Sequence, residues 1–210
     1  MASDTGDTLD AWAATHDRSV ARGSGYYERY DEVLDAVANV ACPVPGVTVL
    51  DIGTGTGNLA LRCLERGAVV VGVDPSAGML AQALCKRPTG AALEFMRVGE
   101  PFLHLPFGDA SFDGIVSTYA FHHVPRELHH ASIAEAFRVL RPGGLWALGD
   151  VAFEDEAQER AALHRHEWLE AEEFALVDAV RAAVEARGAE LRTMWFTDVT
   201  QVLWAAKPGG

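Results

Sequence analysis

The segment that decides the fold is Asp51-Ile52-Gly53-Thr54-Gly55-Thr56-Gly57-Asn58. It follows an apolar run at residues 47–52, which predicts a buried strand, and it leads into a predicted helix at residues 58–66. Glycines at three alternate positions allow positive φ angles and let the backbone approach a bound molecule closely. A strand-to-helix turn without a ligand seldom needs three glycines, so the segment predicts a binding loop.

Strands and helices alternate along the chain after this loop. The residue patterns predict further strands at 69–73, 93–98, 112–118 and 145–151. They also predict a helix at 76–86 with Ser76 as its N-cap, and a helix at 125–140 that Pro142-Gly143-Gly144 ends. This alternation indicates an α/β fold with an open parallel sheet and helices on both faces.

The two ends of the chain depart from this alternation. Residues 9–40 are predicted to form two helices that break near residues 23–25, and residues 154–187 are predicted to be helical. Two apolar or alternating segments, 191–196 and 199–205, are separated only by Thr197-Asp198. Because a parallel return needs about a dozen residues, these two segments predict an antiparallel hairpin at the end of the sheet.

The composition is that of a globular domain. With 210 residues, of which 49% are hydrophobic and 22% charged, the chain fits one domain and excludes a disordered, collagen-like or disulfide-stapled protein. No apolar run approaches the ~18 residues that cross a bilayer, and the acidic start lacks the order of a signal peptide. We therefore expect a cytoplasmic protein that does not act at a membrane. The three cysteines lack metal-ligand spacing and indicate reduced thiols.

Charge limits the partners and the ligand of the loop. Lys and Arg number 17 against 30 Asp and Glu, a net charge of −13, so nucleic acid is not an expected partner. A dinucleotide fingerprint would need glycine where Asn58 stands, and no Lys-Ser or Lys-Thr pair follows the loop. Asp51 would repel a pyrophosphate but attract a cation. The loop is therefore expected to hold a positively charged nucleoside.

Two more acids follow predicted strands. Asp74 stands where a carboxylate can accept both hydroxyls of a ribose; its alternative role as a helix N-cap is one that Ser76 can already fill. Glu100 follows the next strand and could accept a hydrogen bond from an exocyclic amine, with Phe102 and Met79 available to sandwich a base. The alternative for Glu100 is an ordinary solvated side chain.

Five segments together carry a resemblance to a known family. Residues 49–57, 72–80, 105–113, 120–124 and 139–144 resemble the class I S-adenosylmethionine-dependent methyltransferases, and more narrowly the small bacterial enzymes of the ubiquinone/menaquinone-biosynthesis type (type 11). The resemblance extends over residues 12–208. It implies a Rossmann-like, seven-stranded sheet in the order 3-2-1-4-5-7-6 with strand seven antiparallel. It also implies an N-terminal helical lid, residues 1–45, on an S-adenosylmethionine-binding domain, residues 46–210.

The resemblance also implies roles for single residues. Gly53 and Gly55 would pass under the methionine part of S-adenosylmethionine, with Asp51 near its ammonium group. Asp74 would hold the ribose, and Glu100, where the family usually has Asp, would meet the adenine amine. The full set expected to bind the donor is Asp51, Gly53, Thr54, Gly55, Gly57, Asn58, Asp74, Pro75, Met79, Glu100, Pro101, Thr118, Tyr119 and Tyr26. The family's N-terminal Tyr-Asp pair is replaced here by His16-Asp17.

Catalytic candidates follow the fourth strand and the N-terminal helices. The methyl donor is already activated, so positioning is the enzyme's main contribution, and a general base is needed only where the acceptor holds its proton. His122, His123 and Tyr119 are the candidates after strand four, and the alternative for the histidines is a structural hydrogen bond. Tyr26 and Tyr30 are four residues apart and are expected on one helical face, where they would line the pocket or pack on the sheet. Tyr30 is the fourth catalytic candidate.

The remaining predictions concern metal, acceptor and reaction. Adjacent histidines usually point apart, and no acid-plus-histidine helix motif accompanies them here, so no metal site is expected. Because no separate acceptor domain is visible, the sequence favours a small-molecule acceptor, and a homodimer stays open. So does an alternative reaction, in which the donor's own aminobutyrate chain displaces methylthioadenosine and forms a small cyclic amino acid.

Overall fold

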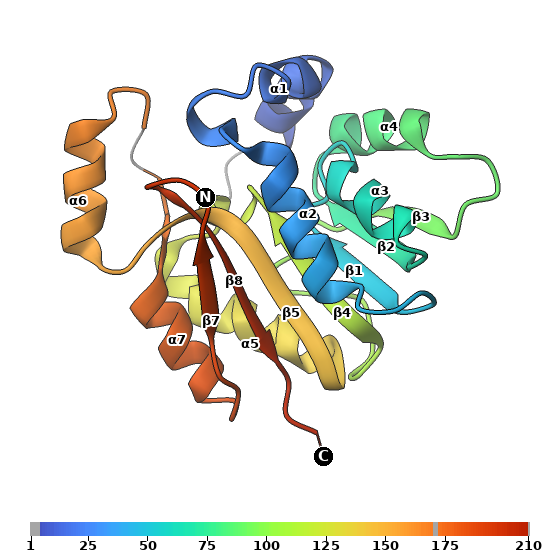
Figure 1. The fold of residues 1–210 in the computed structure, drawn as a ribbon. Coiled ribbons are helices and arrows are strands. Elements are labelled where there is room, and N and C mark those ends of the chain that lie inside the picture. The colour runs from blue at the N-terminus through green and yellow to red at the C-terminus, as the bar shows by residue number, and fades with distance from the viewer. Residues whose placement is uncertain (1–4, 170–171, 210) are drawn as a thin grey trace.

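The centre of the fold is a mixed β-sheet with helices on both faces, seen in a computed structural model that describes residues 5–169 and 172–209 (Figure 1). The strands are β1 (Thr48–Ile52), β2 (Val69–Asp74), β3 (Leu93–Arg97), β4 (Phe112–Thr118), β5 (Leu140–Phe153), β6 (Ala175–Leu176), β7 (Arg192–Trp195) and β8 (Thr200–Ala206). The helices are α1 (Thr5–Val20), α2 (Tyr30–Ala41), α3 (Asn58–Glu65), α4 (Ala77–Lys86), α5 (His129–Val139), α6 (Glu156–Arg165) and α7 (Val177–Glu185). Short 3-10 turns are η1 (Gly25–Tyr27), η2 (Phe121–His123) and η3 (Arg126–Leu128).

The strand order confirms the predicted topology. The strands lie in the order β3-β2-β1-β4-β5-β8-β7, and the two-residue β6 pairs with β5. β8 runs antiparallel to β5 and β7, whereas the other pairs are parallel. Without β6, this is the implied order 3-2-1-4-5-7-6 with strand seven antiparallel. The predicted terminal hairpin is formed by β7 and β8.

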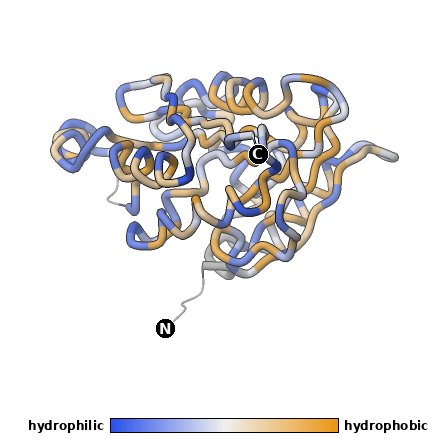
Figure 2. Tube along the Cα trace, turned by 90° about the horizontal axis from the view of Figure 1, so that it is seen from below, coloured by the Kyte–Doolittle hydropathy of each residue, from blue (hydrophilic) through white to orange (hydrophobic). Residues whose placement is uncertain are grey.

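Successive residues of β1 point to opposite faces of the sheet and pack in two separate hydrophobic cores. Val49 packs in a cluster with Val37 of α2 and Leu59 of α3. Leu50 packs in a cluster that includes Val180 of α7. Each of these side chains is at most 3% exposed. Figure 2 shows hydrophobic and hydrophilic residues interspersed along the helices, as expected where one helix face covers a core.

The fifth strand is longer than predicted. β5 begins at Leu140, so Pro142-Gly143-Gly144 lies inside the strand instead of separating helix from strand. Its pairing with β4 shifts register between Phe112 and Gly114, which places the extra residues of β5 in a bulge. A bulge tolerates proline because its residues do not all donate to the ladder. The helix predicted at 125–140 likewise begins later, as α5, after the turn η3.

The predicted helical stretch at residues 154–187 is interrupted. α6 ends at Arg165, and the chain then forms β6 and α7. Phe174 and Ala175 are buried, and β6 adds to β5, so burial of this apolar segment at the sheet outweighs its helix propensity. Residues 170–171 of the predicted stretch lie outside the described residues.

The N-terminal segment forms two helices as predicted, joined by η1. α2 packs on the sheet, and α1 lies next to α4 (Figure 1). One prediction here is wrong: Tyr26 lies in η1 whereas Tyr30 begins α2, so they do not share a helical face. Between them Arg29 has a φ of 57°, which breaks the helical path. Within the described ranges, no helix combines the length and apolar character that a membrane span needs.

Candidate active site

The glycine loop lies at the carboxyl end of β1 and leads into α3. Gly53, Gly55 and Gly57 have φ angles of 70°, 52° and 82°, the left-handed region that the three glycines predicted. A Cβ atom at Gly53 would lie 2.5 Å from the Cβ of Ala120, which is a steric clash. The absence of a side chain at Gly53 therefore keeps a cradle between the loop and the segment after β4.

Asp51 lies buried beneath this loop. Its Oδ2 accepts a hydrogen bond of 2.7 Å from Oγ1 of Thr54. Its Oδ1 makes no hydrogen bond of ordinary geometry with the described residues, although the backbone amide of Ala60 also favours the carboxylate. Burial and, to a smaller extent, the charge of Asp74 raise the pKa of Asp51, and the hydrogen bond from Thr54 lowers it. The resulting pKa is about 7. A buried carboxylate oxygen without an ordinary hydrogen bond fits the ammonium group of an amino-acid ligand, so the site passes this test for S-adenosylmethionine.

Asp74 is held by backbone groups at the end of β2. Its Oδ2 accepts from the amide of Gly55 and its Oδ1 from the amide of Ser76, each at 2.9 Å. The N-cap of α4 is supplied by Ser76, whose Oγ accepts from the amide of Met79. The carboxylate of Asp74 thus has fixed orientation and further lone pairs, as ribose binding requires.

Two adjoining cavities collect most of the predicted donor-binding residues. The first, of about 60 Å³, is lined by Thr54, Gly55, Thr56, Asn58, Leu59, Met79, Thr118 and Tyr119, with Trp12, His16 and Tyr30 from α1 and α2. The second, of about 340 Å³, is lined by Pro75, Gly99, Glu100, Pro101, Phe102, Leu103, Val124, Pro125 and Leu128. Gly53, Asp74, Ala120 and His123 line both. Of these two cavities, the second falls in the size range of small-molecule sites, ~300–1,000 Å³.

Three of the predicted donor-binding residues do not line either cavity, and a fourth, Glu100, only borders the second one. Asp51 lies below Thr54, Gly57 turns the chain into α3, and Tyr26 packs in a separate aromatic cluster. Glu100 borders the second cavity, but its side chain is 64% exposed and pairs with Nδ1 of His104 at 2.8 Å. Its contact with an adenine amine remains a prediction.

Helix α1 is tied to the loop and to α4 through two acids. Asp17 accepts hydrogen bonds from Oγ1 of Thr56 at 2.6 Å and from Nδ2 of Asn58 at 3.2 Å, and pairs with Lys86 at 2.8 Å. Burial opposes ionisation, but these bonds lower the pKa of Asp17 well below its ordinary value. Asp10 accepts from the amide of Gly78 at the start of α4, a contact that sequence reasoning missed.

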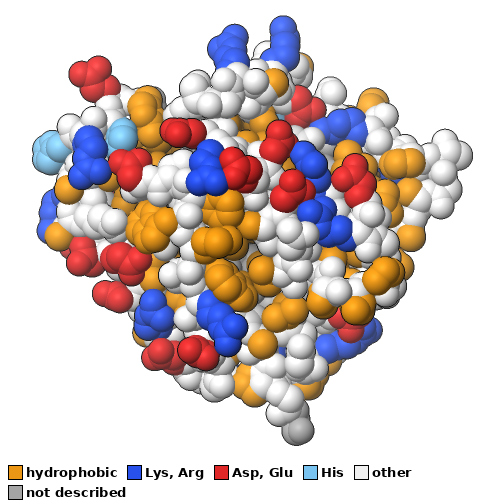
Figure 3. Space-filling model, viewed as in Figure 1, with side chains coloured by type: hydrophobic (Ala, Val, Ile, Leu, Met, Phe, Trp, Pro, Cys, Tyr) orange, Lys and Arg blue, Asp and Glu red, His pale blue; other side chains and the backbone are white. Residues whose placement is uncertain are grey.

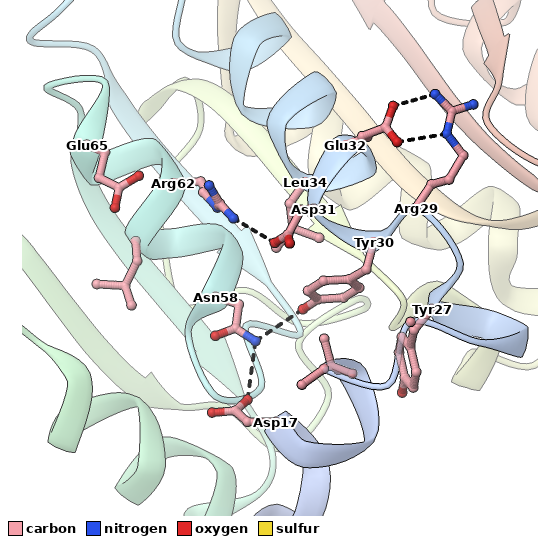
Figure 4. Close-up of a pocket in the computed structure, with 14 residues that line it drawn as sticks. Asp17, Tyr27, Arg29, Tyr30, Asp31, Glu32, Leu34, Asn58, Arg62 and Glu65 are labelled. Atoms are coloured by element: carbon pink, nitrogen blue, oxygen red, sulfur yellow. Dashed lines mark hydrogen bonds and ion pairs between the residues drawn. The ribbon is translucent and has the colours of Figure 1, made fainter.

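A wider groove of about 740 Å³ lies on the other side of these contacts, between the N-terminal helices and α3. Figure 4 shows Asn58 in its wall, linked both to Asp17 and to the hydroxyl of Tyr30. Other charged residues of its wall form pairs, Arg62 with Asp31 and Arg29 with Glu32. The groove lacks the glycines of the loop, whereas Gly53 and Gly55 line the cavity of about 60 Å³.

Three tyrosines meet above the end of β4. The rings of Tyr30 and Tyr119 are stacked with centroids 5.3 Å apart, and Tyr27 contacts each of them edge-on at 5.6 Å. Tyr119 has a φ of 50°, uncommon for a residue with a side chain, and its buried hydroxyl has no partner among the described residues. Burial raises the pKa of all three phenols, so they stay protonated at neutral pH.

The two histidines after β4 differ in their surroundings. His122 is buried, and its Nδ1 lies 2.7 Å from Oδ1 of Asp150. This Oδ1 also accepts from the amide of Val151, and Oδ2 of Asp150 accepts from the amide of Phe121. Burial alone would lower the pKa of His122, but the charge and hydrogen bond of Asp150 raise it. His123 lines both cavities, and burial together with neighbouring His122 lowers its pKa to about 4.

Sequence reasoning missed Asp150 and Glu172. Asp150 interrupts the apolar run at residues 145–153, and a single acid inside a predicted buried strand signals a buried partner. Glu172 gave no such signal, because it stands in a charged segment whose path depends on the packing of Phe174.

Comparison with known proteins agrees with this geometry. A family model described as "Methyltransferase domain" matches residues 49–144. An uncharacterized methyltransferase of Geobacillus sp. (strain WCH70) is 32% identical over 208 residues, and the uncharacterized methyltransferase YrrT of Bacillus subtilis (strain 168) is 31% identical over 209; each match covers 93% of both chains. The crystal structure of magnesium protoporphyrin IX methyltransferase (ChlM) from Synechocystis PCC 6803 with bound SAH (S-adenosylhomocysteine) has a TM-score of 0.75 at 21% identity, covering 97% of this chain and 100% of that one. The chain belongs to the S-adenosylmethionine-dependent methyltransferases with the class I, Rossmann-like fold.

Proposed function

We propose that this methyltransferase acts on a small-molecule acceptor that is enclosed beneath a lid formed by α1, η1 and α2. One observation carries the proposal: Thr118 and Tyr119 at the end of β4 line the same narrow cavity as Trp12 and His16 of α1. By the family resemblance Thr118 and Tyr119 would face the sulfonium, so the lid would close over the methyl group to be transferred. A folded macromolecule would not reach this place, whereas a metabolite that enters when the lid opens would.

The chain's residues would hold the donor at three points. Bound S-adenosylmethionine supplies a methyl group on a positively charged sulfur, which needs no further activation. The Oδ1 of Asp51 would accept from its ammonium group, and Asp74 would accept from the ribose hydroxyls. Tyr30 and Tyr119 keep their phenol protons and are therefore neutral. Their aromatic faces favour a cation by cation–π attraction.

Among the four catalytic candidates, His123 is the best placed to accept a proton. It lines both cavities, whereas His122 is buried against Asp150 and would position the loop. Tyr119 and Tyr30 stay protonated and would act by orienting the acceptor. A base is needed only for an acceptor that keeps its proton at neutral pH.

The surface supports a small acceptor rather than nucleic acid. In Figure 3 basic and acidic side chains are interspersed over the visible face, with no continuous basic stripe. The net charge of −13 would repel a phosphate backbone. The names of the curated relatives favour methyl transfer over the cyclisation that the sequence left open.

Labelled methyl transfer tests the proposal. The full chain is incubated with methyl-labelled S-adenosylmethionine and, separately, the low-molecular-weight, protein and RNA fractions of a bacterial extract. We expect label to enter a small molecule, with one S-adenosylhomocysteine formed per methyl group. Label only in protein or RNA would overturn the small acceptor, and methylthioadenosine released from donor alone would overturn methyl transfer. Asp74→Ala serves as the control with impaired donor binding.

A further inference from the structure

Three ligand-type side chains converge beside the donor cavities. Nε2 of His122 lies 3.6 Å from Oε2 of Glu172, and Nδ1 of His123 lies 3.5 Å from the same oxygen. All three atoms lie within 4.8 Å of one another. The His–Glu separations are longer than ordinary hydrogen bonds, so these contacts do not hold the carboxylate in place.

The two His–Glu separations suit a shared metal ion. Ligands on Zn²⁺ at about 2.0–2.1 Å in tetrahedral geometry lie about 3.3 Å from one another. The two His–Glu separations are within a few tenths of an ångström of that value. Adjacent histidines usually point apart, but the turn η2 brings the rings of His122 and His123 to a centroid distance of 4.2 Å.

A second carboxylate orients one of the three ligands. Asp150 accepts from Nδ1 of His122 and is itself fixed by the backbone amides of Phe121 and Val151. With its Nδ1 proton donated to Asp150, a neutral His122 directs the lone pair of Nε2 toward Glu172. A carboxylate behind a histidine is the usual outer partner of a metal-ligating imidazole.

Charge and surroundings also favour a cation. Asp150 and Glu172 pair with the two histidines, and with no Lys or Arg of the described chain. As metal ligands both imidazoles would be neutral, and the two carboxylates would then leave two negative charges, which one divalent ion would balance. The ring of Tyr26 stacks on His122 and meets Trp168 edge-on, so an aromatic shell covers this side of the cluster.

We propose that His122, His123 and Glu172 bind a divalent transition-metal ion of the Zn²⁺ class, with Asp150 as the positioning carboxylate. Imidazole ligands favour such ions over Mg²⁺. Three protein ligands leave a coordination position open, as in catalytic zinc sites. His123 also lines the donor cavities, so the open position would receive an oxygen or sulfur atom of the acceptor.

The consequence for catalysis rests on the proposed function. An ion at this position would favour the deprotonated form of the acceptor and take over the role of a base. His123, bound through Nδ1, would then act as a ligand and not as the proton acceptor.

Metal binding is tested without donor or acceptor, so its failure leaves methyl transfer untouched. The full chain is treated with a chelator, dialysed and titrated with Co²⁺, followed by absorption spectroscopy and calorimetry. We expect one Co²⁺ per chain with the spectrum of a four-coordinate site, displaced by Zn²⁺ but not by Mg²⁺. Glu172→Gln and His123→Ala should each weaken Co²⁺ binding by at least about tenfold.

The matched control is His130→Ala, which removes an exposed histidine outside the cluster and should leave Co²⁺ affinity unchanged. Circular dichroism of each variant establishes that it is folded; both altered ligands are partly exposed, so we expect folding to tolerate the changes. Absent Co²⁺ binding in the wild type, or equal affinity in the control and in both ligand variants, would overturn the proposal.

Discussion

The carboxylate of Asp74 both anchors the glycine loop and faces the donor cavities. We expect Asp74→Ala to weaken binding of S-adenosylhomocysteine by at least about tenfold, because two charge-assisted hydrogen bonds to the ribose are lost. Isothermal calorimetry measures this. The matched control is Asp113→Ala, which removes a carboxylate that also accepts from a backbone amide, that of Thr48, and pairs with Arg141. Unchanged affinity in Asp74→Ala, or an equal loss in Asp113→Ala, would contradict the placement of the ribose.

Asp51 predicts a pH dependence of donor binding. Its pKa, raised by burial from 3.8 to about 7, means that the free protein holds this carboxyl protonated below neutral pH. Between pH about 4 and about 7 the unfolded chain ionises this carboxyl while the fold keeps it protonated, so the free energy of unfolding falls as pH rises through this range. A bound ammonium group favours the carboxylate, so binding releases a proton below the pKa, and affinity should rise with pH.

Calorimetry with S-adenosylhomocysteine between pH about 5.5 and about 7.5 checks this expectation. The affinity should increase with pH by up to about tenfold per unit and level off above the pKa of Asp51. In Asp51→Asn the affinity should be lower and nearly independent of pH over this range. A wild-type profile as flat as that of the variant would show that Asp51 does not meet the ammonium group.

At the scale of elements, α1 is the part of the proposed lid that we expect to move. Asp17 of α1 accepts a hydrogen bond from Thr56 of the glycine loop. The cavity beneath α1, of about 60 Å³, is smaller than a nucleoside needs. We expect Asp17→Ala to speed amide hydrogen exchange in α1 roughly three- to tenfold, as loss of the Thr56 hydrogen bond permits. Hydrogen exchange with mass spectrometry measures this directly.

The control is Asp31→Ala, which removes the same charge from α2 and breaks only an exposed pair with Arg62. Exchange in α1 should be unaffected in this variant, because exposed ion pairs contribute little. If both variants open α1 equally, Asp17 does not hold the lid.

The parts of the fold that depend only on neighbouring residues could be predicted from the sequence. The link of Thr197-Asp198 permits only an antiparallel return, and Ser76 caps α4 as its residue type predicts. The path of residues 172–176 was not predictable, because pairing of β6 with β5 depends on distant residues. For the same reason the sequence did not bring Asp150 or Glu172 to the histidines, nor separate Tyr26 from Tyr30.

At the scale of the whole molecule, charge selects the ligand. The glycine loop has a buried acid beneath it and an aspartate at its edge, on a chain whose net charge is −13. Each of these features disfavours a phosphorylated cofactor and favours a cation. The fold by itself would not distinguish these ligands, because Rossmann-like sheets bind both kinds.

Thermal unfolding puts this selection to a test on the intact chain. A ligand at a hundredfold excess over its dissociation constant stabilises the fold by about 2.7 kcal/mol. For a domain of this size that corresponds to a rise in Tm of about 5–10 °C. S-adenosylmethionine and S-adenosylhomocysteine should produce this rise in Tm. In Asp74→Ala most of the rise should be lost. NADH and ATP should leave the Tm unchanged, because the loop places a carboxylate where their phosphates would bind. A larger rise with NADH or ATP than with S-adenosylhomocysteine would mean that the backbone amides of the loop, and not Asp51, determine what binds.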